Sequence, residues 1–365
     1  MRIGVIDADL IGRKRHRFPN LACMKISGYH KEQGHEVHLL TEYRHIDEYD
    51  RVYISKVFTD TPVPVWVLNR GNVKYGGTGF FFDQAPDLPY EIEHHMPDYR
   101  LYDDFIKKQM LSGVKRSEFK EYLDYSIGYT TRGCFRKCDF CVNRKYDRVF
   151  QHSPLSEFYD PSRPKICLLD DNVFGHPHWR EIFSELSATG KPFKFKQGLD
   201  ERLLTDEKCE MLCQAKYDGE ITFAFDNIAD YRRIEQKLQM IRRYTWKRFT
   251  FYVLVAFDHH DRWDDDFWRQ DIIEAFERIK LLMMYGCIPY IMRFERYNAS
   301  PMRGMYITLA RWCNQPSFYK TKSFREFAEM NGEKSAAMRY IRDFESKYPE
   351  IARAYFNMKY EEVSP

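Results

Sequence analysis

The chain has 365 residues, 44% of them hydrophobic, and its 57 Lys and Arg residues nearly balance its 54 Asp and Glu residues. This balance argues against binding to nucleic acid through bulk electrostatic attraction, and the length allows one large domain with a smaller attachment. We find no run of about 18 uncharged apolar residues and no cationic leader before an apolar run, so we expect neither a membrane span nor export. The odd count of nine cysteines then indicates reduced thiols in a cytoplasmic protein.

The first eighty residues alternate between strands and a helix. Short runs rich in Val, Ile and Leu predict strands at residues 2–7, 36–41 and 52–55. Residues 19–31 have the pattern of a helix that ends at Gly34. Alternation of this kind predicts a parallel sheet in a small domain over residues 1–82. Prolines, charges and one amphipathic stretch at residues 101–111 then mark residues 83–123 as a connector.

From residue 124 onwards the alternation becomes regular. Strands are predicted at residues 125–130, 165–173, 193–197, 221–226, 249–257 and 288–294. Helices are predicted at residues 178–188, 205–215, 231–241 and 264–285. Six strand–helix repeats predict an α/β fold, a partial (β/α)6 barrel over residues 124–297 that is open on one side. The tail, residues 298–365, has helical patterns at 301–313, 323–330 and 333–347 and is predicted to be a helical cap on that barrel.

Polar residues collect where the predicted barrel strands end. They are Asp170, Asp171, Asn172, Gln197, Asp200, Asp226, Asn227, Asp258, Arg293 and Glu295. In barrels of parallel strands the chemistry lies at the carboxyl ends of the strands, because the loops there vary without disturbing the core. Any single one of these residues is equally well explained as a solvent-exposed side chain at a strand end. Their recurrence at five strands indicates a site.

Residues 131–141, TRGCFRKCDFC, place Cys134, Cys138 and Cys141 within eight residues. Thiolate is the ligand that iron–sulfur clusters favour, and this spacing suits three corners of a cubane cluster. The fourth iron is then left without a protein ligand, so a small molecule can bind there and receive an electron.

Two other uses of the three cysteines stay open. One is a structural zinc site with a remote fourth ligand such as His152, and the other is a set of buried thiols on one helical face. Gly133 and the cations Arg132, Arg136 and Lys137 favour an exposed loop over an apolar helix. A structural zinc site usually brings its ligands as two pairs, and no second pair at short spacing is present.

The Cys-x3-Cys-x2-Cys spacing resembles the signature of the radical S-adenosylmethionine (SAM) superfamily. In that family the open iron of a [4Fe–4S] cluster binds the amino and carboxylate groups of SAM, and one electron releases a 5′-deoxyadenosyl radical that abstracts hydrogen from a substrate. The resemblance implies that Cys134, Cys138 and Cys141 are the metal ligands. An external reductant, a flavodoxin or ferredoxin, is implied as well, because no second cluster motif is visible and the task needs a low reduction potential.

The resemblance also implies roles for other residues. Phe140 matches the aromatic residue of the family motif that contacts the adenine. Asp170, Asp171 and Asn172 lie where many members have a Gly-Gly-Glu-like run that holds the amino group of SAM, although the glycines are missing here.

Further candidates come from the later strands. Gln197, Asp226 and Asn227 are candidates for the methionine carboxylate and the ribose hydroxyls. Asp258, Arg293 and Glu295 are the substrate-facing candidates. Arg293 and Glu295 share strand parity, so they are expected either to face the substrate or to form an ion pair beneath a helix.

The layout of residues 1–82, with the run Gly76-Gly77-Thr78-Gly79, looks like the Rossmann-like domain of superfamily members that carry a cobalamin-binding module. The sequence lacks the Asp-x-His-x-x-Gly run that supplies an imidazole to cobalt in many cobalamin proteins, and a glycine turn occurs in any Rossmann-like unit. Some members of that group bind cobalamin without the histidine, and others keep the fold with no cofactor.

Three hypotheses result. The chain is a radical SAM enzyme that abstracts hydrogen from an unknown substrate, a cobalamin-dependent radical SAM methyltransferase, or a non-catalytic iron–sulfur or zinc protein.

Overall fold

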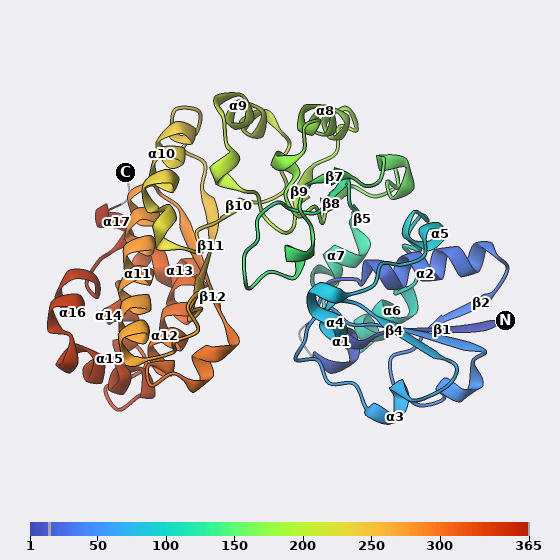
Figure 1. The fold of residues 1–365 in the computed structure, drawn as a ribbon, viewed down its shortest axis with the longest axis horizontal. Helices are drawn as coiled ribbons and strands as arrows, with labels where there is room; N and C mark the ends of the chain where they lie inside the picture. Colours follow the sequence, from blue (N-terminus) through green and yellow to red (C-terminus); the bar gives the residue numbers. More distant parts are fainter. Residues whose placement is uncertain (14–15, 364–365) are drawn as a thin grey trace. The chain divides into compact units, whose positions relative to one another are not determined.

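The computed structural model describes residues 1–13 and 16–363, and the chain forms two compact units, Met1–Lys196 and Gln197–Pro365 (Figure 1). The division between the units falls inside the segment 124–297 that was predicted as one barrel. Each unit is described by itself below.

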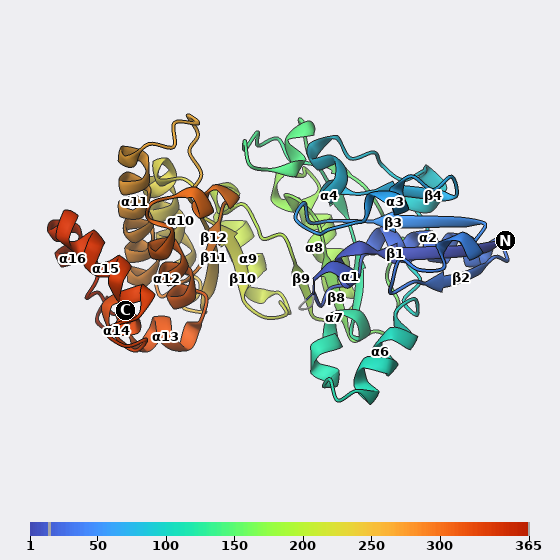
Figure 2. The ribbon, with the colours of Figure 1, turned by 90° about the horizontal axis from the view of Figure 1, so that it is seen from below.

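The first unit begins with a four-stranded parallel sheet in the order β2-β1-β3-β4. Its strands are β1 (Arg2–Asp7), β2 (Glu36–Leu39), β3 (Arg51–Ser55) and β4 (Val73–Gly76). Short helices follow three of them: α1 (Ala8–Gly12), α3 (Val65–Leu68) and α4 (Thr78–Phe81). The longer helix α2 (Leu21–Glu32) runs along the sheet, as Figure 2 shows. The predicted strands and helix are confirmed, whereas β4 was missed because its four residues, half of them polar or Gly, carry no clear pattern.

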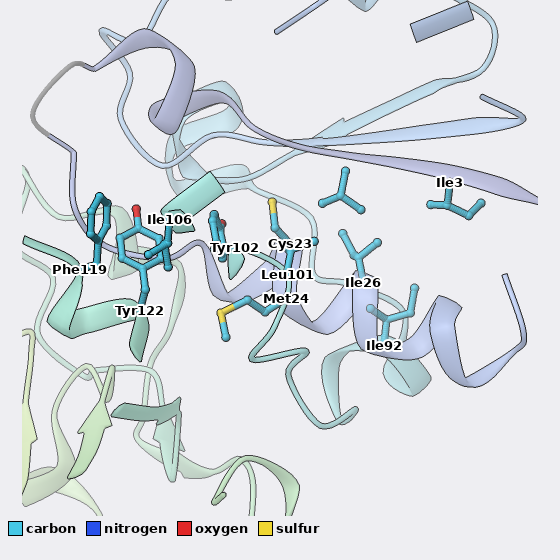
Figure 3. Packing of buried hydrophobic residues seen from close by; sticks show 11 residues of the cluster. Ile3, Cys23, Met24, Ile26, Ile92, Leu101, Tyr102, Ile106, Phe119 and Tyr122 are labelled. Carbon is cyan, nitrogen blue, oxygen red and sulfur yellow. The ribbon is translucent and has the colours of Figure 1, made fainter. Parts of the chain in front are cut away.

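The segment predicted as a connector is part of the core of this unit. It contains the helices α5 (Tyr90–Glu93), α6 (Asp103–Leu111) and α7 (Lys120–Leu123). It supplies six of the eleven buried residues of a hydrophobic cluster that also includes side chains of β1 and α2 (Figure 3). The cluster consists of Ile3, Val5, Cys23, Met24, Ile26, Ile92, Leu101, Tyr102, Ile106, Phe119 and Tyr122. Burial of such side chains stabilises by about 1.5–3 kcal/mol each, so this segment is integral to the fold and not a linker.

The first unit ends with a three-stranded parallel sheet in the order β5-β8-β9. The strands are β5 (Tyr125–Gly128), β8 (Lys165–Leu168) and β9 (Phe193–Phe195). Helix α8 (Trp179–Ala188) buries Trp179, Ile182, Phe183 and Leu186, and Phe183 packs on Phe193 and Phe195. Between β5 and β8 the described residues contain no α-helix. The cysteine segment, the antiparallel pair β6 (Thr131–Arg132) and β7 (Phe150–Gln151), and short 3-10 turns take its place.

The second unit contains another three-stranded parallel sheet, in the order β10-β11-β12. The strands are β10 (Ile221–Ala224), β11 (Phe249–Val255) and β12 (Ile288–Arg293), and the helices between and before them are α9 (Asp206–Gln214), α10 (Tyr231–Arg242) and α11 (Asp265–Met284). All six predicted strands of residues 124–297 therefore exist, but as two sheets of three. The structure confirms the coarser class, a mixed α/β protein with parallel sheets.

The C-terminal tail is helical, as predicted, and packs within the second unit. It contains α12 (Arg303–Cys313), α13 (Pro316–Thr321), α14 (Phe324–Glu329), α15 (Ala336–Lys347), α16 (Pro349–Tyr355) and α17 (Tyr360–Val363). Asn314 extends the ladder of β12, because its Oδ1 accepts the N–H of Ile291 at 2.7 Å and its Nδ2 donates to the carbonyl of Ile291 at 3.1 Å. None of the helices in the described ranges combines the length and apolarity that crossing a bilayer requires.

Candidate functional site

The three cysteines lie in a loop whose neck is closed by the β6–β7 ladder. Thr131 pairs with Gln151 and Arg132 with Phe150, so the two ends of the loop 133–149 lie side by side. Gly133 opens the loop with φ +86°, in the left-handed region, and a Cβ there would overlap the carbonyl oxygen of Arg148. The neck therefore needs a glycine directly before Cys134.

Backbone and side-chain N–H groups point at the sulfurs. The N–H of Arg136 lies 3.3 Å from Sγ of Cys134, and the N–H of Asn143 lies 3.4 Å from Sγ of Cys141. Nδ2 of Asn172 lies 3.4 Å from Sγ of Cys134. Sulfurs that accept N–H bonds suit thiolates, and such bonds are characteristic of the protein environment of iron–sulfur clusters.

The alternative of buried thiols on a helical face is wrong. No α-helix forms over residues 131–141, and all three cysteines are partly exposed. The other cysteines that are fully buried, such as Cys23 and Cys167, lie in the packed core.

His152, the example given for a remote fourth zinc ligand, is engaged in other contacts. Nδ1 of His152 lies 3.0 Å from Oγ of Ser153, its Nε2 lies 3.3 Å from Oε1 of Glu93, and the ring stacks on His94. Both ring nitrogens of His152 are thus engaged. No three His, Cys, Asp or Glu side chains in the described part of the chain come together to hold a single metal ion. Three thiolates are donors that suit a cubane cluster, one on each of three irons.

Asp170 holds the entry to the cysteine loop. Its carboxylate accepts bonds from the backbone N–H groups of Thr130 and Thr131 at 3.0 and 2.7 Å, and from both of their hydroxyls at 2.5 and 2.7 Å. The side chain is buried, and this burial raises its pKa, while the four hydrogen bonds favour the ionised form.

Asp171 joins the two sides of the loop. It accepts the N–H of Gly133 and Nδ2 of Asn143, both at 2.7 Å, and lies 3.7 Å from Nε of Arg132. Burial raises the pKa of Asp171, and Arg132 opposes that effect. In this structure Asp170 and Asp171, two of the three residues predicted to receive the amino group of SAM, are thus bound to protein donors and fix the cysteine loop. Phe140 lies in the same loop, between Cys138 and Cys141, and is partly buried.

The remaining predicted cofactor ligands lie in the second unit. Gln197 is exposed. Oδ1 of Asp226 accepts the N–H of Leu254 at 3.2 Å, and burial raises the pKa of this carboxyl. Asn227 caps a 3-10 turn through Ala229, and its Nδ2 lies 3.3 Å from Nε2 of His259. The structure therefore brings Asp226 and Asn227 to the carboxyl ends of β10 and β11, beside a histidine that sequence reasoning did not single out.

Asp258, one of the substrate-facing candidates, organises a loop. It is buried and accepts the N–H groups of His260, Arg262 and Trp263 at 2.9, 2.8 and 3.3 Å, and these bonds hold its pKa below the ordinary value, against burial. The segment is strained, because Ala256, Asp261 and Trp263 all have φ between 52° and 62°.

The parity argument for Arg293 and Glu295 is wrong. Strand β12 ends at Arg293, and Glu295 begins a 3-10 turn, Glu295–Ala299. Arg293 is exposed, with its guanidinium 4.4 Å from the ring centre of Tyr297, and Glu295 is also exposed. Neither residue is covered by a helix, so the ion pair expected beneath one does not form.

Two buried charged residues of the second unit were missed. Burial raises the pKa of Glu201 to about 8, and the neighbouring Asp200 adds to the effect. Arg278 of α11 donates from Nη1 to the carbonyls of Phe225, Asp226 and Leu254 at 2.8–3.0 Å. No pattern in the sequence signals either, because the burial of a single charged residue is decided by segments distant in the chain.

The N-terminal sheet offers cobalamin no histidine ligand. Asp7 and Gly12 keep the spacing of the Asp-x-His-x-x-Gly run, but Asp9 stands in place of the histidine. Its buried carboxylate accepts the N–H of Val57 at 2.7 Å and the hydroxyl of Thr61. A carboxylate that is hydrogen-bonded within the protein therefore stands where the metal-binding imidazole would be.

Two of the three glycines at the end of β4, Gly77 and Gly79, are used in internal packing. A Cβ at Gly77 would overlap the carbonyl of Lys56, and one at Gly79 would lie 2.7 Å from Cγ of Lys56 and 2.8 Å from the carbonyl of Phe58. Both glycines are required by the protein's own packing against Lys56. We derive no chemistry through cobalamin.

No protein-family model matches the sequence, and no curated protein matches it. Two solved structures of the cobalamin-dependent S-adenosylmethionine radical enzyme OxsB, one with aqua-cobalamin bound and one apo, align over 100% of this chain at 13% identity, with TM-scores of 0.36 and 0.37. The chain spans 58% and 57% of the length of those chains. At this level of similarity no function is carried over, and the proposal below depends on the residues of this chain.

Proposed function

We propose that this protein is a radical SAM enzyme that holds a [4Fe–4S] cluster on Cys134, Cys138 and Cys141. The observation that carries the proposal is the cysteine loop itself: three partly exposed thiols at this spacing, with N–H groups directed at two of the sulfurs. The loop is fixed at its neck by the β6–β7 ladder and at its base by the residues that follow β8.

When bound, the cluster would supply the electron that cleaves SAM to the 5′-deoxyadenosyl radical, which abstracts hydrogen from a substrate. The chain's own contribution is to hold three thiolates in a rigid loop and to leave the fourth iron without a protein ligand. Asp170 and Asp171 fix that loop from inside, where hydrogen bonds between buried groups are strong.

For SAM we propose Phe140 as a contact of the adenine. Gln197, Asp226 and Asn227 are proposed for the methionine carboxylate and the ribose hydroxyls from the family resemblance alone. A flavodoxin or ferredoxin is the proposed reductant.

The test is anaerobic reconstitution with iron and sulfide, followed by reduction with dithionite in the presence of SAM. The wild-type protein should contain iron and sulfide in the ratio of a cubane and should release 5′-deoxyadenosine. Cys138→Ala should abolish that release. Cys213→Ala removes an equally partly exposed thiol outside the loop and should leave it unchanged. Release by Cys138→Ala at the wild-type rate would refute the assignment of the ligands.

A further inference from the structure

Three consecutive residues after β8 each hold a different part of the cysteine loop. Asp170 binds the entry at Thr130 and Thr131, and Asp171 binds both sides of the loop at Gly133 and Asn143, as described above. Asn172 reaches a ligand sulfur itself, through its Nδ2 at 3.4 Å from Sγ of Cys134.

The position of Asn172 relative to Cys134 is fixed by packing. Asn172 is 3% exposed and precedes the 3-10 turn Val173–Gly175. Gly175 at the end of that turn lies against Phe135, the neighbour of Cys134, so closely that a Cβ would come 2.8 Å from Cε1 of the ring. The amide is therefore directed at the sulfur by a tightly packed turn and not by a mobile surface loop.

We infer that Asn172 raises the reduction potential of the metal centre by donating its amide N–H to Sγ of Cys134. The inference rests on the proposed function, because it requires a cluster bound at Cys134. A cluster that gains an electron gains negative charge, and part of that charge resides on its thiolate ligands. An N–H dipole directed at the sulfur stabilises the reduced form more than the oxidised form, and burial strengthens the effect.

Asn143 provides a matched control. Its side chain binds the same Asp171 that stabilises the loop, but it does not reach a sulfur. The bond from Asn143 to Sγ of Cys141 comes from the backbone N–H and is retained in an alanine variant. Loss of the Asn143 side chain therefore loosens the loop without removing an N–H···S bond.

The experiment is an anaerobic redox titration of the reconstituted cluster without SAM, followed by electron paramagnetic resonance, in the wild type, Asn172→Ala, Asn172→Asp and Asn143→Ala. At the ambient potential where half of the wild-type clusters are reduced, the ratio of reduced to oxidised clusters should fall about three- to tenfold in Asn172→Ala. A tenfold fall corresponds to about 59 mV for one electron. Asn172→Asp keeps the size of the side chain but replaces the donor with an acceptor, and its ratio should fall at least as far.

Asn143→Ala should keep the wild-type potential, although it should lose iron faster to a chelator. The inference is overturned if both Asn172 variants, with the cluster in place, titrate as the wild type does. It is overturned as well if Asn143→Ala shifts the potential as far as Asn172→Ala does, because the shift would then report a loosened loop. A wild-type protein that assembles no cluster would instead refute the proposed function.

Discussion

At the scale of single residues, Gly133 is needed both for the backbone path and for the hydrogen bonding of the cysteine loop. It is the point where the chain leaves the β6–β7 ladder, and both its left-handed φ and the carbonyl of Arg148 exclude a side chain. Its N–H is also the group by which Asp171 holds the loop. The glycine thus combines a backbone requirement with a hydrogen bond that fixes the cysteine loop.

We expect Gly133→Ala to impair the cysteine loop selectively. The strained φ and the overlap with Arg148 together cost about 1–3 kcal/mol, which opening of the neck would relieve. Iron retention in the presence of a chelator should fall at least several-fold, as measured by absorbance of the reconstituted protein. Gly190→Ala is the control, because Gly190 has φ +69° but no atom lies within 4 Å of its Cβ position. Equal iron loss in the two variants would show that the overlap with Arg148 is unimportant.

Glu201 makes the stability of the protein depend on pH near neutrality. Its pKa, about 8 in the folded chain against 4.5 as the ordinary value, means that the folded state keeps a proton that the unfolded state loses. The free energy of unfolding should therefore fall as the pH rises from about 4.5 through about 8.

Glu201→Gln mimics the neutral carboxyl and should flatten that decline, as measured by the melting temperature between pH 5 and pH 9. The exposed Glu185→Gln is the control and should keep the wild-type profile. An unchanged pH profile in Glu201→Gln would mean that Glu201 is ionised in the folded protein.

At the scale of elements, helix α11 is joined to the sheet of the second unit by one buried arginine. Nη1 of Arg278 donates to the carbonyls that end β10 and to Leu254 in β11, and Nη2 lies 3.9 Å from Asp271, which in turn accepts the N–H of Ala256. The same helix buries an apolar stripe that includes Ile272, Phe276 and Ile279. The polar contacts therefore define how the carboxyl ends of the strands, with Asp226 among them, are arranged beneath the helix.

We expect Arg278→Ala to destabilise the protein by about 3–5 kcal/mol in denaturant unfolding, because it leaves the buried Asp271 without its charge partner and several strand carbonyls without their donor. Arg278→Lys keeps the charge but lacks the planar guanidinium that reaches several carbonyls, and it should recover only part of the loss. Arg269→Ala on the same helix is the control. Its half-buried guanidinium faces the exposed Asp266 at 3.6 Å, so it should cost less than about 1 kcal/mol. Comparable losses for Arg269→Ala and Arg278→Ala would contradict this account.

At the scale of the whole molecule, the local pattern predicted most of the elements. Strands β1, β2, β3, β5, β8, β9, β10, β11 and β12 and helices α2, α8, α9, α10 and α11 lie within or near the expected ranges. Their apolar spacing is a local property, set by the 3.6-residue and 2-residue periods of the backbone. Which strands pair is not local, and the six strands expected in one barrel form two sheets of three.

Residues 83–123, predicted as a connector, show the same limit of local sequence patterns. Prolines and charges marked residues 83–123 as a linker, although Tyr102 and Phe119 within them are buried. The amphipathic stretch at residues 101–111 forms helix α6, but the other apolar residues of this segment are widely spaced, and only their packing on β1 and α2 reveals their role.

The sequence by itself determined where the three thiols lie and that the segment holding them is a loop, because a short run of cysteines with a preceding glycine depends on covalent spacing alone. Only the tertiary structure decided what Asp170, Asp171 and Asn172 do, since their partners lie about 30 to 40 residues earlier in the chain. It likewise decided that Asp258 caps a loop and that Glu295 lies outside β12. Hydrogen bonds between distant segments form only after the chain has packed, and no local pattern encodes them.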